Sequence, residues 1–157
     1  MKTAIVIYSQ SGHTAEVAKA LGAVFTARGH EVDITLLRTA GNVTSRSGNF
    51  ELRSVPDIKE YDCIIIGGPV IGFRASPVTM KFLAQTGRLD GKKVLCLVTK
   101  GLPFLWTGGT QALRAMEEEL ALSQAQQLPG EIIFAGNIRN KVRLDGIVTA
   151  IADRCGA

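Results

Sequence analysis

Short apolar segments with the length of buried strands alternate along this chain with segments whose apolar residues recur at helical spacing. Such an alternation is typical of a parallel sheet that is covered by helices on both faces. The sequence therefore predicts an α/β fold built on five parallel strands. The predicted strands are Thr3–Tyr8, Glu31–Leu37, Cys63–Gly67, Lys93–Val98 and Glu131–Phe134.

Helices are predicted between and after these strands. The first helix has an apolar stripe, and Gly29 follows it as a C-terminal stop. The residues of this stripe are Val17, Leu21, Val24 and Phe25. The later predicted helices are Pro77–Thr86, Gly109–Leu122 and Leu144–Cys155.

The stretch Arg38–Tyr61 does not follow the alternation, because Gly, Asn, Ser, Thr and Arg dominate it and only Pro56–Glu60 suggests a helical turn. We predict a long loop here. Loops of more than about 12 residues in compact domains are usually functional or mobile, so this one is a candidate to cover a site or to contact another subunit.

Length, composition and charge narrow the class of protein. With 157 residues, of which 46% are hydrophobic, the chain is predicted to form a single domain over residues 1–157. No apolar run approaches the roughly 20 residues that span a bilayer, and the N-terminus lacks a signal-peptide pattern, so we expect a cytoplasmic protein without membrane contact. The net charge of +4 comes from scattered Lys and Arg residues, which argues against nucleic-acid partners. Cys63, Cys96 and Cys155 lack metal-ligand spacing and are expected to be reduced, partly buried thiols.

Ligands of an open parallel sheet bind beyond the carboxyl ends of the strands, where the strand order reverses. For five strands in the order 2-1-3-4-5, that point lies between the first and third strands. The loops at this edge of the sheet are Ser9–Thr14, Gly68–Ser76 and Thr99–Gly109.

The loop Ser9–Thr14 is suited to a phosphate group. Free N–H groups at the start of the following helix and the helix dipole favour an anion by about 0.3–1 kcal/mol, and Gly12 lets the backbone approach closely. The loop has no lysine and so lacks the Walker pattern, which favours a phosphate monoester over a nucleoside triphosphate. The alternative is that Ser11 or Thr14 simply caps the helix.

Ser9, Ser11, Gly12 and Thr14 match the FMN-phosphate loop Ser/Thr-x-Ser/Thr-Gly-x-Thr, and over nearly its whole length the sequence resembles the flavodoxins. The resemblance implies a flavodoxin-like three-layer α/β/α sandwich with strand order 2-1-3-4-5 and non-covalently bound FMN. It implies that this whole loop, with Gln10 and His13, contacts the phosphate end of the cofactor.

The segment Gly67–Pro77 looks like the loop after the third strand in flavodoxin-family oxidoreductases, where it forms one wall of the flavin site. The resemblance implies that the peptide at Gly72 flips as flavin N5 gains or loses a proton, which requires a positive φ that glycine adopts at little cost. It also implies that Ile71 packs on the ring. The cofactor contacts implied for this loop are Pro69, Val70, Ile71, Gly72 and Phe73.

The third loop contains the only Trp and one of the six Phe residues in a stretch that we expect to be exposed. Stacking on a flat ring would explain such aromatics, because it adds about 0.5–1.5 kcal/mol beyond area burial. The alternative is that Phe104, Leu105 and Trp106 cap the core or form a homodimer contact. Many flavodoxins have a tyrosine at this wall, so which aromatic stacks here is left open. The cofactor contacts predicted for this loop are Thr99, Lys100, Gly101 and Trp106.

The second and third loops contain no Asp or Glu but do contain Arg74 and Lys100. Low-potential flavodoxins surround the flavin with carboxylates. A charge about 6 Å from the ring is worth roughly 3 kcal/mol at an effective dielectric constant of about 20, or on the order of 100 mV before solvent screening. We therefore predict a higher potential than that of an acidic flavodoxin.

Three functions stay open. The first, which we favour because the chain is short and shows no second nucleotide site, is an electron carrier between redox proteins. The second is an NAD(P)H-dependent FMN or quinone oxidoreductase of the same fold that acts on a small-molecule electron acceptor. The third is an interaction domain without FMN. Tyrosine phosphatases, response-regulator receivers and Rossmann dinucleotide domains are disfavoured because their signature residues are missing.

Overall fold

The structure is a computed structural model that describes residues 1–41, 43, 49–104 and 106–157. Within these residues, five parallel strands form a sheet in the order β2-β1-β5-β7-β8. Counted along the chain, this is the predicted order 2-1-3-4-5. The parallel strands are β1 (Lys2–Ile7), β2 (Glu31–Leu36), β5 (Cys63–Ile71), β7 (Lys93–Lys100) and β8 (Gln126–Phe134).

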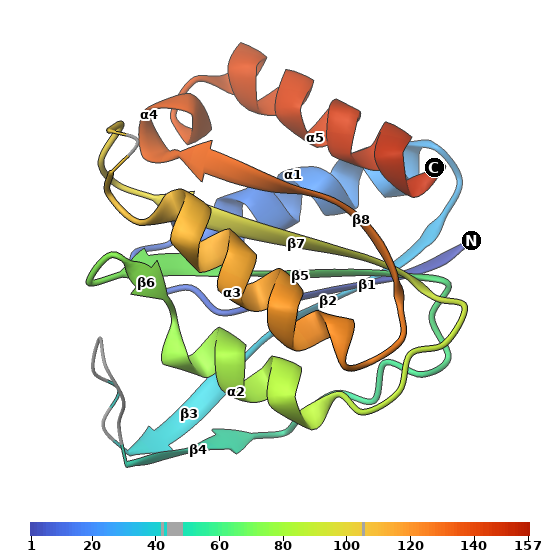
Figure 1. Cartoon of the computed structure of the whole chain (residues 1–157). Helices are drawn as coiled ribbons and strands as arrows, with labels where there is room; N and C mark the ends of the chain where they lie inside the picture. Colours follow the sequence, from blue (N-terminus) through green and yellow to red (C-terminus); the bar gives the residue numbers. More distant parts are fainter. Residues whose placement is uncertain (42, 44–48, 105) are drawn as a thin grey trace.

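Helices cover both faces of the sheet, which gives the three layers seen in Figure 1. On one face lie α1 (His13–Ala27) and α5 (Lys141–Cys155), with the short α4 (Ala135–Ile138) preceding α5. On the other face lie α2 (Pro77–Gln85) and α3 (Gly109–Ala121). The chain thus folds as a three-layer α/β/α sandwich, as the sequence predicts.

Two apolar cores separate the layers, because successive side chains of a strand point to opposite faces. In β5, Ile64 and Ile66 belong to the core under α2 and α3, whereas Cys63 and Ile65 belong to the core under α1 and α5. Both faces of β5 are therefore buried, and its continuous apolar run is the signature of a central parallel strand.

The predicted long loop over Arg38–Tyr61 is wrong in part. The chain forms an antiparallel hairpin of β3 (Arg38–Gly41) and β4 (Phe50–Arg53). A helical turn was predicted over Pro56–Glu60, but these described residues contain a turn and no helix. Phe50 packs into the core beneath α2, and Lys81 Nζ donates to its carbonyl oxygen at 2.7 Å. These strands are short and contain several polar residues, so local composition does not predict them. Their stability comes from packing such as that of Phe50 beneath α2. Residues 42 and 44–48 of this stretch lie outside the described residues.

Strand β8 begins five residues earlier than predicted, at Gln126. Pro129 and Gly130 obscure it in the sequence, but a proline is tolerated on an edge strand, and the register with β7 shifts between Leu95 and Leu97, opposite this pair. Helix α5 likewise starts before the predicted Leu144, because Asn140 caps it by accepting from Arg143 N at 3.2 Å.

The three cysteines are free and fully buried, more deeply than the sequence led us to expect. None of the helices in the described part of the chain combines the length and apolar character that a membrane span requires.

Candidate functional site

The carboxyl ends of β1, β5 and β7 bring the three predicted loops to one edge of the sheet. Pro69 at the end of β5 pairs with Thr99 at the end of β7. The hydroxyls of Thr14 and Thr99 lie 2.8 Å apart in the interior, so the first and third loops are joined directly. The predicted site residues from all three loops therefore share one edge of the sheet.

The first loop leads into an open helix start. Gly12 is the N-cap of α1 with φ 92°, and its carbonyl oxygen accepts from Glu16 N at 3.0 Å. A Cβ built on Gly12 would have no heavy atom within 4 Å, so the backbone here is accessible from outside. The first N–H groups of an α-helix have no acceptor within the helix, and those of His13 and Thr14 are in this position.

The hydroxyls of this loop have defined partners. Ser9 Oγ accepts from Ala15 N at 3.3 Å, and Ser11 Oγ lies 3.3 Å from His13 Nδ1. Thr14 is buried and turned toward Thr99. Among the hydrogen bonds of the described residues, Ser9, and not Ser11 or Thr14, satisfies a backbone donor of the helix start, which contradicts the N-cap alternative for those two residues. Gln10 and Ser11 are exposed.

The second loop, for which the sequence analysis gives no internal structure, is a tight hairpin. The short strand β6 (Arg74–Ala75) turns back on β5, with Val70 opposite Ala75 and Ile71 opposite Arg74. Gly72 and Phe73 form its turn with φ values of 56° and 64°. Two central residues with positive φ define a type I′ turn, which matches the twist of the paired strands.

The positive φ expected at Gly72 is therefore present, but the structure adds a strained neighbour. A bulky residue with positive φ is an outlier that costs about 1–3 kcal/mol and persists only where its surroundings impose it. Here the two-residue turn between β5 and β6 requires it. The third loop packs closely against this turn, because a Cβ on Gly108, whose φ is 95°, would clash with the Phe73 carbonyl group. The hairpin and the third loop thus pack backbone against backbone.

The hairpin turn and the third loop together carry an exposed aromatic cluster, which we define as Phe73, Phe104 and Trp106. The rings of Phe104 and Trp106 are stacked with centroids 5.7 Å apart and an interplanar angle of 5°, and Phe73 meets Trp106 edge-on at 6.0 Å. The exposed fractions are 53% for Phe73, 53% for Phe104 and 67% for Trp106. The alternative that Phe104 and Trp106 cap the core is therefore wrong, and Leu105 lies outside the described residues.

A cavity of about 210 Å³ lies between the hairpin and the third loop. Lys100 belongs to its wall and donates from Nζ to the Phe104 carbonyl oxygen at 3.0 Å. Two lining residues, Leu102 and Thr107, were not predicted as site residues. Their position in the loop Thr99–Gly109 was the only signal for either of them. Among the described residues, the lining consists of Val70, Gly72, Phe73, Lys100, Gly101, Leu102 and Thr107.

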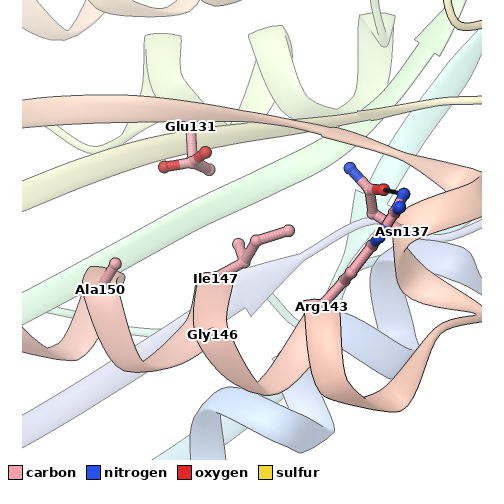
Figure 2. Close-up of a pocket in the computed structure, with 6 residues that line it drawn as sticks. All are labelled: Glu131, Asn137, Arg143, Gly146, Ile147 and Ala150. Atoms are coloured by element: carbon pink, nitrogen blue, oxygen red, sulfur yellow. Dashed lines mark hydrogen bonds between the residues drawn. The ribbon is translucent and has the colours of Figure 1, made fainter.

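A larger cavity of about 510 Å³ lies between β8 and α5 (Figure 2). Arg143 donates to Asn137 Oδ1 at 3.2 Å, and Glu131 pairs with Arg154. These polar side chains of the cavity wall therefore already have partners within the chain. None of the residues predicted for the site lines this cavity. We therefore place the candidate site at the three loops.

Comparison with known proteins finds no matching family model and no matching curated protein. Among solved structures, a short-chain flavodoxin associated with a non-canonical PDU bacterial microcompartment has a TM-score of 0.68 at 17% identity, covering 99% of both chains. Flavodoxin 1 from Bacillus cereus has a TM-score of 0.67 at 18% identity, covering 96% of this chain and 98% of its own.

General stress protein 14 from Treponema denticola, solved in complex with FMN, has a TM-score of 0.66 at 15% identity and covers 99% of both chains. These likenesses extend over almost the whole chain and agree with the observed strand order. The chain therefore has the flavodoxin-like fold.

Proposed function

We propose that this protein binds FMN at the carboxyl ends of β1, β5 and β7 and serves as an electron-transfer protein. The observation that carries the proposal is the open, glycine-started N-terminus of α1 at the same edge of the sheet as the cavity beside the β5–β6 hairpin. Structural neighbours that are flavodoxins, and one solved with FMN, support the same assignment.

The phosphate would bind at the start of α1. The N–H groups of the first turn and the positive end of the helix dipole favour a dianion, and Gly12 leaves their approach unobstructed. The exposed Ser11 hydroxyl and Gln10 amide can donate to its oxygens. Thr14 would act by positioning, because its hydroxyl ties this loop to Thr99.

The ring would lie at the cavity between the hairpin and the third loop. At about 210 Å³ the cavity is smaller than most ligand pockets, which span about 300–1,000 Å³, so we expect it to enclose one edge of the ring and leave another edge in solvent. The Gly72 peptide, already at positive φ in the hairpin turn, is the backbone group placed to meet that edge. Bound FMN supplies the redox chemistry, and the protein sets its position and potential.

The assignment is tested by titrating the purified protein with FMN and with riboflavin, which lacks the phosphate. We expect FMN to bind at least about tenfold more tightly, because a charge-assisted phosphate site contributes about 1.5–3 kcal/mol. Gly12→Ala places a methyl group at the open helix start and should weaken FMN binding while changing riboflavin binding little.

Gly29→Ala is the matched control, because Gly29 also has positive φ and open space but follows the other end of α1. It should leave FMN affinity unchanged. Equal affinity for FMN and riboflavin, or equal effects of the two substitutions, would contradict the phosphate site.

The reductase alternative is distinguished by anaerobic mixing of the FMN-loaded protein with NADPH or NADH. A carrier leaves the flavin absorbance unchanged over the time in which a reductase bleaches it. Rapid bleaching would show that the protein is not an electron carrier of this kind and would support an NAD(P)H-dependent oxidoreductase instead.

A further inference from the structure

Charged residues are segregated between the two ends of the parallel sheet. Between Asp62 and Glu117 the chain contains a single acidic residue, Asp90, although the carboxyl-end loops of β5 and β7 both lie in this stretch. Most acidic residues lie instead near the amino ends of the strands or at helix ends on that side. They are Glu31, Glu60, Asp62, Asp90, Glu117, Glu118, Glu119 and Asp153.

Five cations lie at the carboxyl end, where acidic residues are few. Arg38 lies two residues beyond the end of β2, where Leu37 N donates to Ile7 O, and Arg53 pairs with it across the β3–β4 hairpin. Arg74 is on the β5–β6 hairpin and Lys100 ends β7. Arg139 follows β8 at the end of α4. We call these five residues the basic rim.

Ion pairing reinforces the contrast. Lys2, Arg28 and Arg88 at the amino end each pair with a carboxylate within 4.0 Å. Within the described part of the chain, no member of the basic rim has such a pair, and residues 42, 44–48 and 105 include no Asp or Glu.

The acidic residues at the carboxyl end are few. Glu51 is on the hairpin and pairs with Lys81 at 3.4 Å, Glu16 is in the first turn of α1, and Asp145 is near the start of α5, where it pairs with Lys141 at 3.4 Å. This end of the molecule therefore carries an uncompensated positive field, which attracts acidic surfaces and raises their association rates.

The exposed aromatic cluster lies within this basic rim. Phe73 directly precedes Arg74, and the Phe104 carbonyl oxygen accepts from Lys100. Exposed aromatic side chains surrounded by arginines and lysines have the composition of a protein interface, in which rings form the desolvated centre and charges the rim. Aromatics exposed to this degree in a monomer are otherwise unfavourable.

We propose that the aromatic cluster and the basic rim form the docking surface for an acidic redox protein. That docking serves electron transfer rests on the proposed function, because it would bring the partner against the cavity where the ring binds. That the partner is negatively charged rests only on the charges and the exposed rings of this surface. A partner with a basic face would be repelled from this surface.

Cytochrome c provides a pair of matched probes, because the native protein is basic and succinylation of its lysines makes it acidic without removing the haem. The FMN-loaded protein, reduced with dithionite, is mixed with each ferric cytochrome in a stopped-flow experiment over a range of ionic strengths. We expect the rate with the acidic cytochrome to fall about tenfold between about 0.01 M and 0.15 M salt, and the rate with the native one to rise.

Arg74→Glu and Lys59→Glu change the net charge equally, but Lys59 is exposed near the amino end of β5. At low salt, Arg74→Glu should slow the acidic cytochrome about three- to tenfold and Lys59→Glu less than about twofold. Equal effects of the two substitutions, or salt dependences of the opposite sign, would overturn the proposal.

A binding measurement separates this proposal from the proposed function. The single Trp gives one indole N–H signal, so ¹⁵N-labelled protein titrated with succinylated cytochrome c at low salt reports directly on Trp106, with or without FMN. Shifts at Trp106, Phe73 and Arg74 support the docking surface even if FMN binding fails. Shifts at the amino end of the sheet, or none, contradict it even if FMN binds.

Discussion

The two ends of the parallel sheet differ in what surrounds their exposed charged and aromatic groups. At the amino end, Tyr61 OH donates to Asp33 at 2.7 Å and Lys2 N donates to Asp62 at 2.8 Å, so connections are held by hydrogen bonds and ion pairs. At the carboxyl end, the rings of Phe73, Phe104 and Trp106 are exposed, and in the described part of the chain the five cations of the basic rim have no carboxylate within 4.0 Å. Exposed rings and cations of this kind suit a binding site on loops held by a rigid scaffold, because a ligand or partner can cover them.

The largest expected effect tests the contact between the hairpin and the third loop. Gly108→Ala forces a Cβ against the Phe73 backbone and should lower the free energy of unfolding by about 3 kcal/mol. Gly87 also has positive φ but lies in open space after the C-terminal end of α2. Gly87→Ala should therefore lower the free energy of unfolding by only about 1 kcal/mol. Urea denaturation of both variants measures the difference, and similar costs would show that the two loops do not support each other.

The next effect concerns the potential of the bound flavin. Arg74→Glu and Lys100→Glu reverse charges beside the cavity and should lower the potential by about 20–60 mV after solvent screening. Lys59→Glu is the control with the same change in net charge and should lower it by less than about 10 mV, since its charge is screened over the longer distance. Potentiometric titration of the FMN-loaded variants decides, and equal shifts would mean that local charge does not set the potential.

A smaller effect concerns Phe73, where we expect a substitution to raise the free energy of unfolding, although most substitutions lower it. Phe73→Asn keeps the turn and replaces a strained aromatic by a residue that tolerates positive φ, so it should raise the free energy of unfolding by about 0.5–1 kcal/mol. It should at the same time weaken docking of the acidic cytochrome, because the ring is lost. A loss of stability would mean that the edge contact with Trp106 outweighs the backbone strain.

The smallest effect lies at the amino end and depends on pH. The hydrogen bond to Asp33 raises the pKa of Tyr61 to about 12 from its ordinary value of 10.0. Because the folded state holds this proton more tightly, the stabilisation is complete below about pH 10 and is lost as pH rises through about 12. Tyr61→Phe should therefore cost about 0.5 kcal/mol at pH 8 and less at pH 11, by denaturant titration at both values. A cost that is constant with pH would contradict this account.

Local patterns in the sequence were sufficient to predict the five parallel strands, though not all of their bounds, and the loops that follow them. Apolar runs such as that ending at Ile66 and the glycine before α1 are visible without any long-range contact, and both are present in the structure. The β3–β4 hairpin was not predictable, because Phe50 is buried only by a helix that follows it by many residues. Strand β8 was underestimated because the cost of Pro129 depends on its place at the sheet edge.

The sequence by itself determined the alternation of elements and the three loops after the first, third and fourth parallel strands, because hydrophobic periodicity and turn residues act locally. The strand order was expected only from the resemblance to the flavodoxins. Only the tertiary structure decided that the second loop is a type I′ hairpin packed against Gly108, that Trp106 stacks on Phe104, and that most acidic residues lie at the end of the sheet opposite the aromatic cluster. These features depend on contacts between residues far apart in the chain, and the free energy of such contacts exists only once the sheet has brought them together.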